Sequence, residues 1–191
     1  MALLGVRLKS LGYGAIHLPT FGYHLRSLDT HGAELRRLLL RVVGQGADYD
    51  VVTFSFGGVF LRAALADGSV PLPRRVVMLS PPSQGALRAQ QVRAQLPFHL
   101  LGWDPLAPLL PGEPARYPMP PTEVGILAGG TGGETGFSRR LPGDNDGKVR
   151  VAEAHHPGVV FKRVPQRHFQ MPFSNLAFQE TRAFLETGSF L

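Results

Sequence analysis

The chain of 191 residues contains no cysteine, and this absence removes several kinds of chemistry at once. Disulfides, thiolate metal sites and cysteine nucleophiles are excluded, while the redox compartment stays open. No apolar run is long enough to span a bilayer, so no integral membrane segment is predicted. Residues 1–12 place Arg7 and Lys9 within an apolar pattern and offer no cleavage site, so no signal peptide is visible. The location stays unknown, with the cytoplasm as the default for the sequence as it stands.

Charged residues are also sparse, at 18% against 43% hydrophobic residues, which is typical of a globular protein. The formal net charge is +6. The basic residues are mostly arginines scattered along predicted helices, as in Arg36, Arg37 and Arg41, and are not grouped with aromatic side chains. This pattern favours a solvated surface over a nucleic acid partner, and it leaves a weak attraction to anionic surfaces as the alternative.

Short apolar segments alternate with helical patterns along the chain. The predicted strands cover residues 13–18, 50–54, 75–79, 123–128 and 159–164. Predicted helices lie between Asp29 or Thr30 and Gly44, over residues 57–66, and after a capping Ser174. Several strands are continuous Val, Ile and Leu runs, which is typical of a mostly parallel sheet covered by helices on both faces. We found no repeat and no linker, so we expect one α/β domain over residues 1–191.

Residues 84–121 interrupt this alternation. The first part has a helical pattern, and prolines from position 97 onwards then exclude regular structure. Such a segment is a surface excursion, and above an active site it would act as a lid or a pocket wall. Within it, the apolar residues around Trp103 would either line an acyl pocket or hold the segment down as a local patch; they include Phe98, Leu100 and Leu101.

Three polar residues follow predicted strands in the order serine, aspartate, histidine. Ser55 comes directly after the second strand, Asp146 lies in a turn after the fourth, and His168 follows the fifth. Reactive groups in an open parallel sheet lie on turns at the carboxyl ends of strands. Each residue has a simpler interpretation, as a helix cap, a turn former and a loop or core histidine. Their joint order is one in which serine hydrolase triads occur, with Asp144 as the rival acid.

Ser55 stands on a strand-to-helix turn and is followed by Phe56, Gly57 and Gly58. Such a turn, called a nucleophile elbow, exposes the hydroxyl, and small neighbours let the strand and the helix approach closely. The N-terminus of the helix adds backbone N–H groups and a positive dipole end where an oxyanion would form. We therefore expect the N–H of Phe56 to be one oxyanion donor.

Residues 51–58 (VVTFSFGG) and 75–85 (RVVMLSPPSQG) resemble the strand–elbow–strand region of bacterial lipase/esterase-like α/β-hydrolases. Residues 145–149 (NDGKV) resemble the acid turn of that family, and His168 stands where its histidine is expected. The similarity extends over nearly the whole chain. By this resemblance, Ser55 attacks an ester carbonyl, His168 accepts its proton and Asp146 orients the imidazole.

The sequence departs from the family pattern in two places. Thr53 occupies the elbow position two before the serine, where the family has glycine, and a β-branched side chain there would strain the turn. The strand and His-Gly loop that supply the family's second oxyanion donor would precede residue 8, and this chain begins inside the helix that should follow them. Their absence would leave a gap in the sheet between residues 13–18 and 50–54. His31-Gly32 is predicted to lie in helix and loop, and not to replace that oxyanion loop.

Two hypotheses follow from this second departure. Either the natural protein extends upstream of Met1, or this form exists and pairs its flanking strands directly or is inactive. Losing one oxyanion donor lowers the rate by about 100- to 1000-fold.

Other motifs add no second chemistry. The glycine-rich residues 129–136 lack the Gly-Lys-Ser/Thr ending of a phosphate loop, and the pair His155-His156 has no third ligand at metal spacing. No cofactor and no metal is therefore predicted. The sequence favours a serine hydrolase that cleaves small or lipid-like carboxylic esters through an acyl-enzyme. The alternatives are an acyltransferase with the same triad and a non-catalytic or decayed α/β-hydrolase-fold protein.

Overall fold

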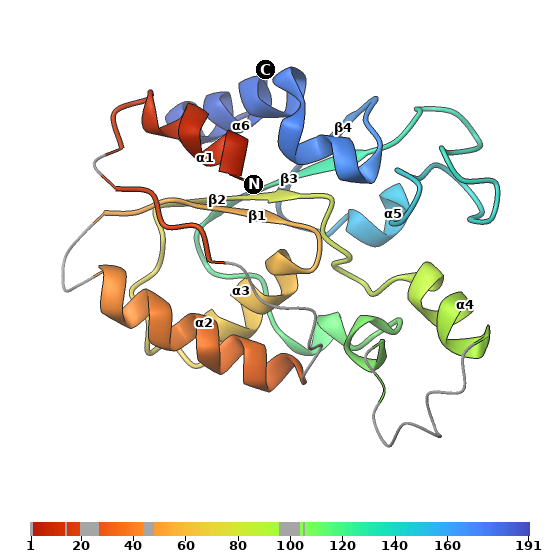
Figure 1. The fold of residues 1–191 in the computed structure, drawn as a ribbon, viewed down its shortest axis with the longest axis horizontal. Helices are drawn as coiled ribbons and strands as arrows, with labels where there is room; N and C mark the ends of the chain where they lie inside the picture. The colour runs from red at the N-terminus through yellow and green to blue at the C-terminus, as the bar shows by residue number, and fades with distance from the viewer. Residues whose placement is uncertain (1, 14, 20–26, 44–47, 96–103, 105) are drawn as a thin grey trace.

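A computed structural model describes residues 2–13, 15–19, 27–43, 48–95, 104 and 106–191 (Figure 1). At its centre lies a four-stranded parallel sheet in the order β1-β2-β3-β4. The strands are β1 (Val51–Phe54), β2 (Arg75–Leu79), β3 (Glu123–Gly129) and β4 (Val160–Val164). Four of the five predicted strands are thus confirmed, each to within one residue at either end.

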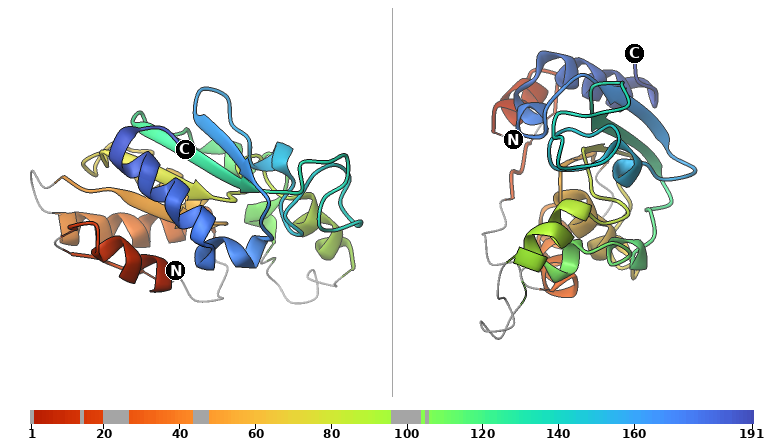
Figure 2. Two further views of the ribbon diagram at one scale, coloured as in Figure 1. Left: turned by 90° about the horizontal axis from the view of Figure 1, so that it is seen from above. Right: turned by 90° about the vertical axis from the view of Figure 1, so that its right-hand side faces the viewer.

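Helices cover both faces of the sheet, as the apolar runs predicted. The α-helices are α1 (Ala2–Lys9), α2 (Leu28–Val43), α3 (Gly57–Leu65), α4 (Leu87–Gln95), α5 (Val151–Ala154) and α6 (Asn175–Thr187). Helices α2 and α3 lie on one face, and α1 and α6 on the other (Figures 1 and 2). No helix in the described ranges combines the length and the apolar character that a membrane span requires.

The two central strands are buried on both sides. Val76 and Met78 of β2 belong to the core formed with α2 and α3, whereas Val77 and Leu79 belong to the core formed with α1 and α6. All four are fully buried. Successive side chains of a strand point to opposite faces, so a strand between two helical layers must be apolar at every position. This requirement explains the continuous apolar runs.

Serine side chains begin two of the helices. Ser174 Oγ accepts a hydrogen bond from the N–H of Ala177, so the predicted cap of α6 is confirmed. Helix α2 begins at Leu28, and Ser27 Oγ accepts from the N–H of Thr30 at 3.2 Å. The predicted cap at Asp29 or Thr30 is therefore wrong by two or three residues, because the helix begins earlier and Ser27 satisfies a free amide of its first turn.

The predicted strand at residues 13–18 is wrong. Tyr13 and residues 15–19 form no strand, and the phenol of Tyr13 instead donates a hydrogen bond to Asp50. An apolar run becomes a strand only where another strand offers a ladder partner, and none of the residues that the structure describes does so here. Among the described residues, β1 is therefore an edge strand of the sheet.

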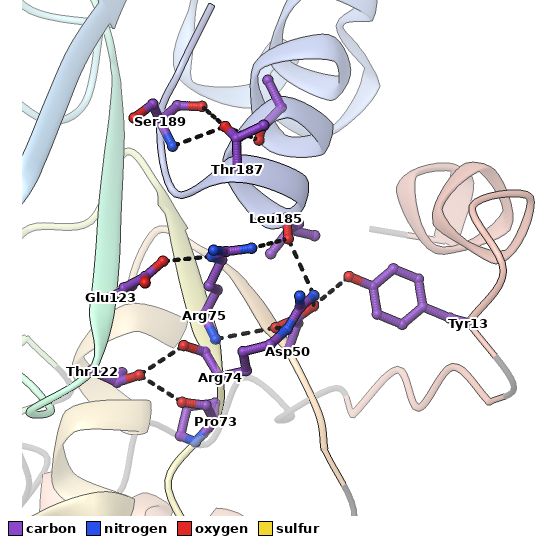
Figure 3. Close-up of polar contacts among 11 residues, drawn as sticks. Tyr13, Asp50, Pro73, Arg74, Arg75, Thr122, Glu123, Leu185, Thr187 and Ser189 are labelled. Atoms are coloured by element: carbon purple, nitrogen blue, oxygen red, sulfur yellow. Dashed lines mark hydrogen bonds and ion pairs between the residues drawn. The ribbon is translucent and has the colours of Figure 1, made fainter.

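A polar network gathers at the amino ends of β1 and β2 (Figure 3). The side chain of Asp50 is 3% exposed and accepts from Arg74 Nε at 3.1 Å, from the N–H of Arg75 at 3.1 Å and from Tyr13. Both arginines also donate to the carbonyl of Leu185 in α6. Burial, followed by the bond to Asp50, raises the pKa of Tyr13 to about 12. The network joins the N-terminal segment, two strands and α6 at the edge away from the strands' carboxyl ends.

The Pro-rich excursion at 84–121 begins with a helix, as predicted, and this helix is α4. Its later described part contains only two short 3₁₀ turns, η2 (Ala107–Leu109) and η3 (Pro114–Arg116). The predicted apolar group around Trp103 lies outside the described residues, together with Phe98, Leu100 and Leu101.

Candidate active site

Ser55 follows β1 directly and adopts a left-handed backbone conformation with φ of 53°. A non-glycine residue in this region is uncommon and indicates a conformation that the surrounding structure imposes. The N–H of Ser55 donates to the carbonyl of Leu79 at 2.8 Å, which fixes the turn to the end of β2. A Cβ at Gly58 would lie only 3.1 Å from Pro81 Cβ, so the missing side chain allows α3 to begin close to the sheet. The hydroxyl is thereby placed at the carboxyl edge.

Thr53 fits beneath this turn because its two glycine neighbours leave space. Its Cβ lies 3.7 Å from the position of a Cβ on Gly57, and its Oγ1 lies 3.3 Å from that of a Cβ on Gly58. Thr53 Oγ1 is buried and finds no hydrogen-bond partner in the described part of the chain. A threonine is therefore accommodated without glycine at that position, at the expense of one unsatisfied hydroxyl.

His168 comes from the first turn of the 3₁₀ segment η4 (His168–Phe173), after β4. Its Nε2 lies 3.0 Å from Ser55 Oγ, and its Nδ1 lies 2.7 Å from Asp146 Oδ2. His168 is 5% exposed, and its imidazole packs between two phenylalanines, with ring centroids 4.9 Å from Phe54 and 5.4 Å from Phe169. The three predicted site residues thus form one continuous chain of hydrogen bonds.

Asp146 is held by the turn that carries it. Its Oδ1 accepts from the N–H groups of Lys148 at 2.9 Å and Val149 at 2.8 Å, which leaves Oδ2 for the imidazole. Its carbonyl accepts from the N–H of His168 at 2.9 Å. The backbone and the side chain of Asp146 therefore both fix the position of His168.

Asn145 organises the same turn and was not singled out from the sequence. It is fully buried, and its Oδ1 accepts from the N–H groups of Ser138 and Gly147 at 2.9 and 3.0 Å. Its Nδ2 donates to three carbonyls, those of Ser138, Leu141 and Gly143. An amide with both donors and acceptors suits a turn that needs both. An asparagine directly before the candidate acid was the available signal.

Asp144, the rival acid, has a different position. Its carboxylate accepts from the N–H groups of Thr131 and Gly132 at 2.6 and 2.9 Å. It therefore orders part of the glycine-rich segment 129–136, and the carboxylate at His168 is that of Asp146. A side chain on Gly129 is excluded, because a Cβ there would lie 2.8 Å from Asp146 Cβ.

The candidate oxyanion donor, Phe56, stands immediately before α3. Its N–H makes no hydrogen bond to any other described residue, so it is available to a ligand at the N-terminus of that helix. His31 and Gly32 lie within α2, as predicted, where His31 packs on the ring of Phe60 at 4.5 Å.

The residues that the structure describes contain no group of three or more His, Cys, Asp or Glu side chains that could hold a metal ion. His156 Nδ1 bonds to the carbonyl of Pro157, and His155 packs edge-on to Phe161.

Comparison with known proteins relates the chain to lipases by fold. No family model matches the sequence, and no curated protein matches it significantly. The mature form of the Bacillus licheniformis lipase BlEst2 matches with a TM-score of 0.66 and 22% identity, over 86% of this chain and 76% of the lipase. The Legionella pneumophila phospholipase PlaB matches with a TM-score of 0.59 and 17% identity, over 80% of this chain and 41% of PlaB. The chain therefore has an α/β-hydrolase-like fold of the kind found in lipases.

Proposed function

We propose that this protein is a serine hydrolase that cleaves carboxylic esters. The observation that carries the proposal is the hydrogen-bonded chain from Asp146 through His168 to Ser55, with the serine on a left-handed turn at a helix N-terminus. A hydroxyl alone is a weak nucleophile, and a histidine within hydrogen-bond reach activates it as a general base.

The proposed reaction proceeds in two halves. Ser55 Oγ attacks the ester carbonyl while His168 Nε2 accepts the serine proton, and a tetrahedral intermediate forms. The intermediate collapses, His168 returns the proton to the departing alcohol, and an acyl-enzyme remains. Water then attacks the acyl group, again losing a proton to His168, which passes it to Ser55 as the carboxylic acid leaves.

Asp146 and Phe56 have supporting roles in this scheme. Asp146 accepts from Nδ1–H, which leaves Nε2 free to take the serine proton and stabilises the imidazolium that forms. The N–H of Phe56 faces the oxyanion with the positive end of the α3 dipole behind it. Phe56 is thus the one oxyanion donor that we propose among the described residues.

Lipid-like esters are the substrate class that we favour. The two structural neighbours named above are a lipase and a phospholipase. Phe169, whose ring packs against His168, is 67% exposed, and Phe173 at the end of η4 is 60% exposed. Exposed aromatic rings of this kind suit contact with apolar groups.

The test is turnover of a short-chain nitrophenyl ester by the purified chain, with Ser55→Ala and the surface control Ser10→Ala alongside. Turnover that Ser55→Ala abolishes and Ser10→Ala retains is expected. Turnover that survives in Ser55→Ala contradicts the assignment. A folded protein that turns over no ester favours the non-catalytic alternative, and ester exchange onto an added alcohol in preference to water favours acyl transfer.

A further inference from the structure

Arg62 is a buried cation on α3, the helix that follows Ser55. It is only 2% exposed, and burial lowers the pKa of its guanidinium to about 10, so it stays charged at neutral pH. No ion pair joins it to an acidic side chain within the described residues. A buried guanidinium without a carboxylate requires other acceptors for its N–H groups.

The acceptors of Arg62 are backbone carbonyls at the two ends of the Pro-rich excursion. Nη1 donates to the carbonyl of Ser83 at 3.0 Å, directly before the excursion begins. Nε donates to the carbonyl of Tyr117 at 2.8 Å, close to its end, and Nη2 donates to the same oxygen. One side chain on the nucleophile's helix therefore joins both limbs of the excursion.

Glu153 of α5 provides a second attachment. Its Oε1 accepts from the N–H of Leu87, the first residue of α4, at 2.7 Å, and its Oε2 accepts from the N–H of Arg150 at 2.9 Å. Its carbonyl accepts from the N–H of Gln84 at 3.0 Å. Helix α5 follows the turn of Asp146, so the excursion is attached to the acid side of the candidate site as well.

The attached segment follows the carboxyl end of β2, to which the serine turn is bonded through Leu79, and it has an apolar character. It leaves the sheet at the carboxyl end of β2, where Pro81 packs against Gly58 beside the serine turn. Its described part includes four partly buried leucines, at positions 87, 106, 109 and 110. An apolar segment held between the nucleophile's helix and the acid's helix suits contact with an acyl chain.

We propose that Arg62 and Glu153 are positioning residues that hold the described part of the excursion, residues 83–95 and 106–117, as a fixed wall for the acyl chain. The proposal rests on the ester hydrolase function proposed above. An acetyl group is too short to depend on the wall, whereas an octanoyl chain extends onto it. Loss of either attachment therefore impairs long substrates selectively, since misplacement of a binding surface lowers transition-state binding.

The test compares kcat/KM for nitrophenyl octanoate and nitrophenyl acetate in Arg62→Met and Glu153→Met. The exposed residues Arg37 and Glu134 supply the matched controls, Arg37→Met and Glu134→Met. The octanoate-to-acetate ratio is expected to fall by about tenfold in the two test variants, with acetate kcat unchanged within about twofold. The controls retain the ratio of the wild type. A parallel loss on both esters, or an unchanged ratio, overturns the proposal.

Leu87→Ala removes the leucine side chain, keeps the amide and serves as the background for the comparison. Relative to it, Leu87→Pro removes the amide that bonds to Glu153 without altering the buried carboxylate, and proline is well tolerated at the first position of a helix. If Arg62→Met fails to fold, this variant and Glu153→Met form a double-mutant cycle. The proposal requires that the two changes together lower the ratio no further than one alone, and additive losses overturn it. A wild-type chain without Ser55-dependent turnover overturns the ester hydrolase function itself, which distinguishes that failure from failure of the wall.

Discussion

A buried aspartate lies at each end of the strands, one at their amino ends and one at their carboxyl ends. Both carboxylates accept several hydrogen bonds, but the donors differ in whether they can release a proton. At the amino edge, Asp50 binds Arg74, the N–H of Arg75 and the phenol of Tyr13. At the carboxyl edge, Asp146 binds two backbone amides and the imidazole of His168. The hydrogen bond to Asp50 raises the pKa of Arg74 above its ordinary value, so this guanidinium keeps its proton, whereas an imidazole ordinarily exchanges its proton near neutrality. The first arrangement therefore stabilises the fold, and the second can transfer a proton to and from Ser55.

Asp146→Asn is the change with the largest expected effect on this comparison. An amide in place of the carboxylate retains the shape but favours the wrong imidazole tautomer, so kcat for a short-chain ester should fall by about 10³- to 10⁴-fold. The thermal midpoint of unfolding should change little. Steady-state kinetics and a melting curve measured on one preparation check both parts. Activity within tenfold of the wild type would contradict the role assigned to Asp146.

Asn145→Leu should affect stability and activity together. Leucine of similar size removes both the donors and the acceptors that satisfy the turn, so we expect a loss of about 3 kcal/mol in the free energy of unfolding. Because the turn carries Asp146, kcat should also fall by about tenfold. Urea denaturation and ester kinetics on the folded fraction measure the two effects. An unchanged kcat would mean that Asp146 is positioned independently of its neighbour.

Asp50→Asn should separate the two edges. Removing the charge from a buried carboxylate beside Arg74 is expected to lower the free energy of unfolding by about 2 kcal/mol. The network lies at the opposite edge from Ser55, so kcat per folded molecule should stay within about twofold. A fall in kcat of about tenfold or more would remove the distinction between the two aspartates.

The smallest expected effect is on the free energy of unfolding at alkaline pH, where the tyrosines lose their protons. Burial raises the pKa of Tyr13, Tyr49 and Tyr117 to about 12 from the ordinary 10.0, so the folded state retains protons that the unfolded state releases. The resulting stability is present below pH 10 and is lost as the pH rises through about 12. Tyr13→Phe should reduce the loss in unfolding free energy measured between about pH 9 and about pH 11.5. An identical loss in wild type and variant would contradict the raised pKa of Tyr13.

The four strands of the sheet were predictable because each is recognised from an apolar run within its own segment. Strands between two helical layers are apolar at every position, and Ser174 caps α6 through its own turn. The failure at residues 13–18 has a different origin, since the same kind of apolar run forms no strand without a ladder partner. Pattern shows what a segment can form, and only the arrangement of its neighbours shows whether it does so.

The three candidate site residues were predictable from the sequence, whereas the contacts that hold them and the neighbouring segments in place were not. The order of Ser55, Asp146 and His168 suggested their meeting, and the resemblance of residues 145–149 to the acid turn of lipase-like hydrolases favoured Asp146 over its rival Asp144. The structure separates the two by their partners, since Asp144 bonds to backbone amides of the glycine-rich segment. Contacts between residues far apart in sequence, such as those of Arg62 with Tyr117, leave no trace in spacing.

Labelling with a fluorophosphonate, followed by peptide mass mapping, tests the central claim most directly. The chain offers an internal control in Ser80, which also has a left-handed conformation, with φ of 45°, but whose buried hydroxyl accepts from the N–H of Gly129. Of these two serines, Ser55 is the one with a histidine within hydrogen-bond distance in the described structure. The account predicts one adduct per chain, on the peptide that carries Ser55 and not on the one that carries Ser80. A folded protein with no adduct, or with its adduct on another serine, would contradict it.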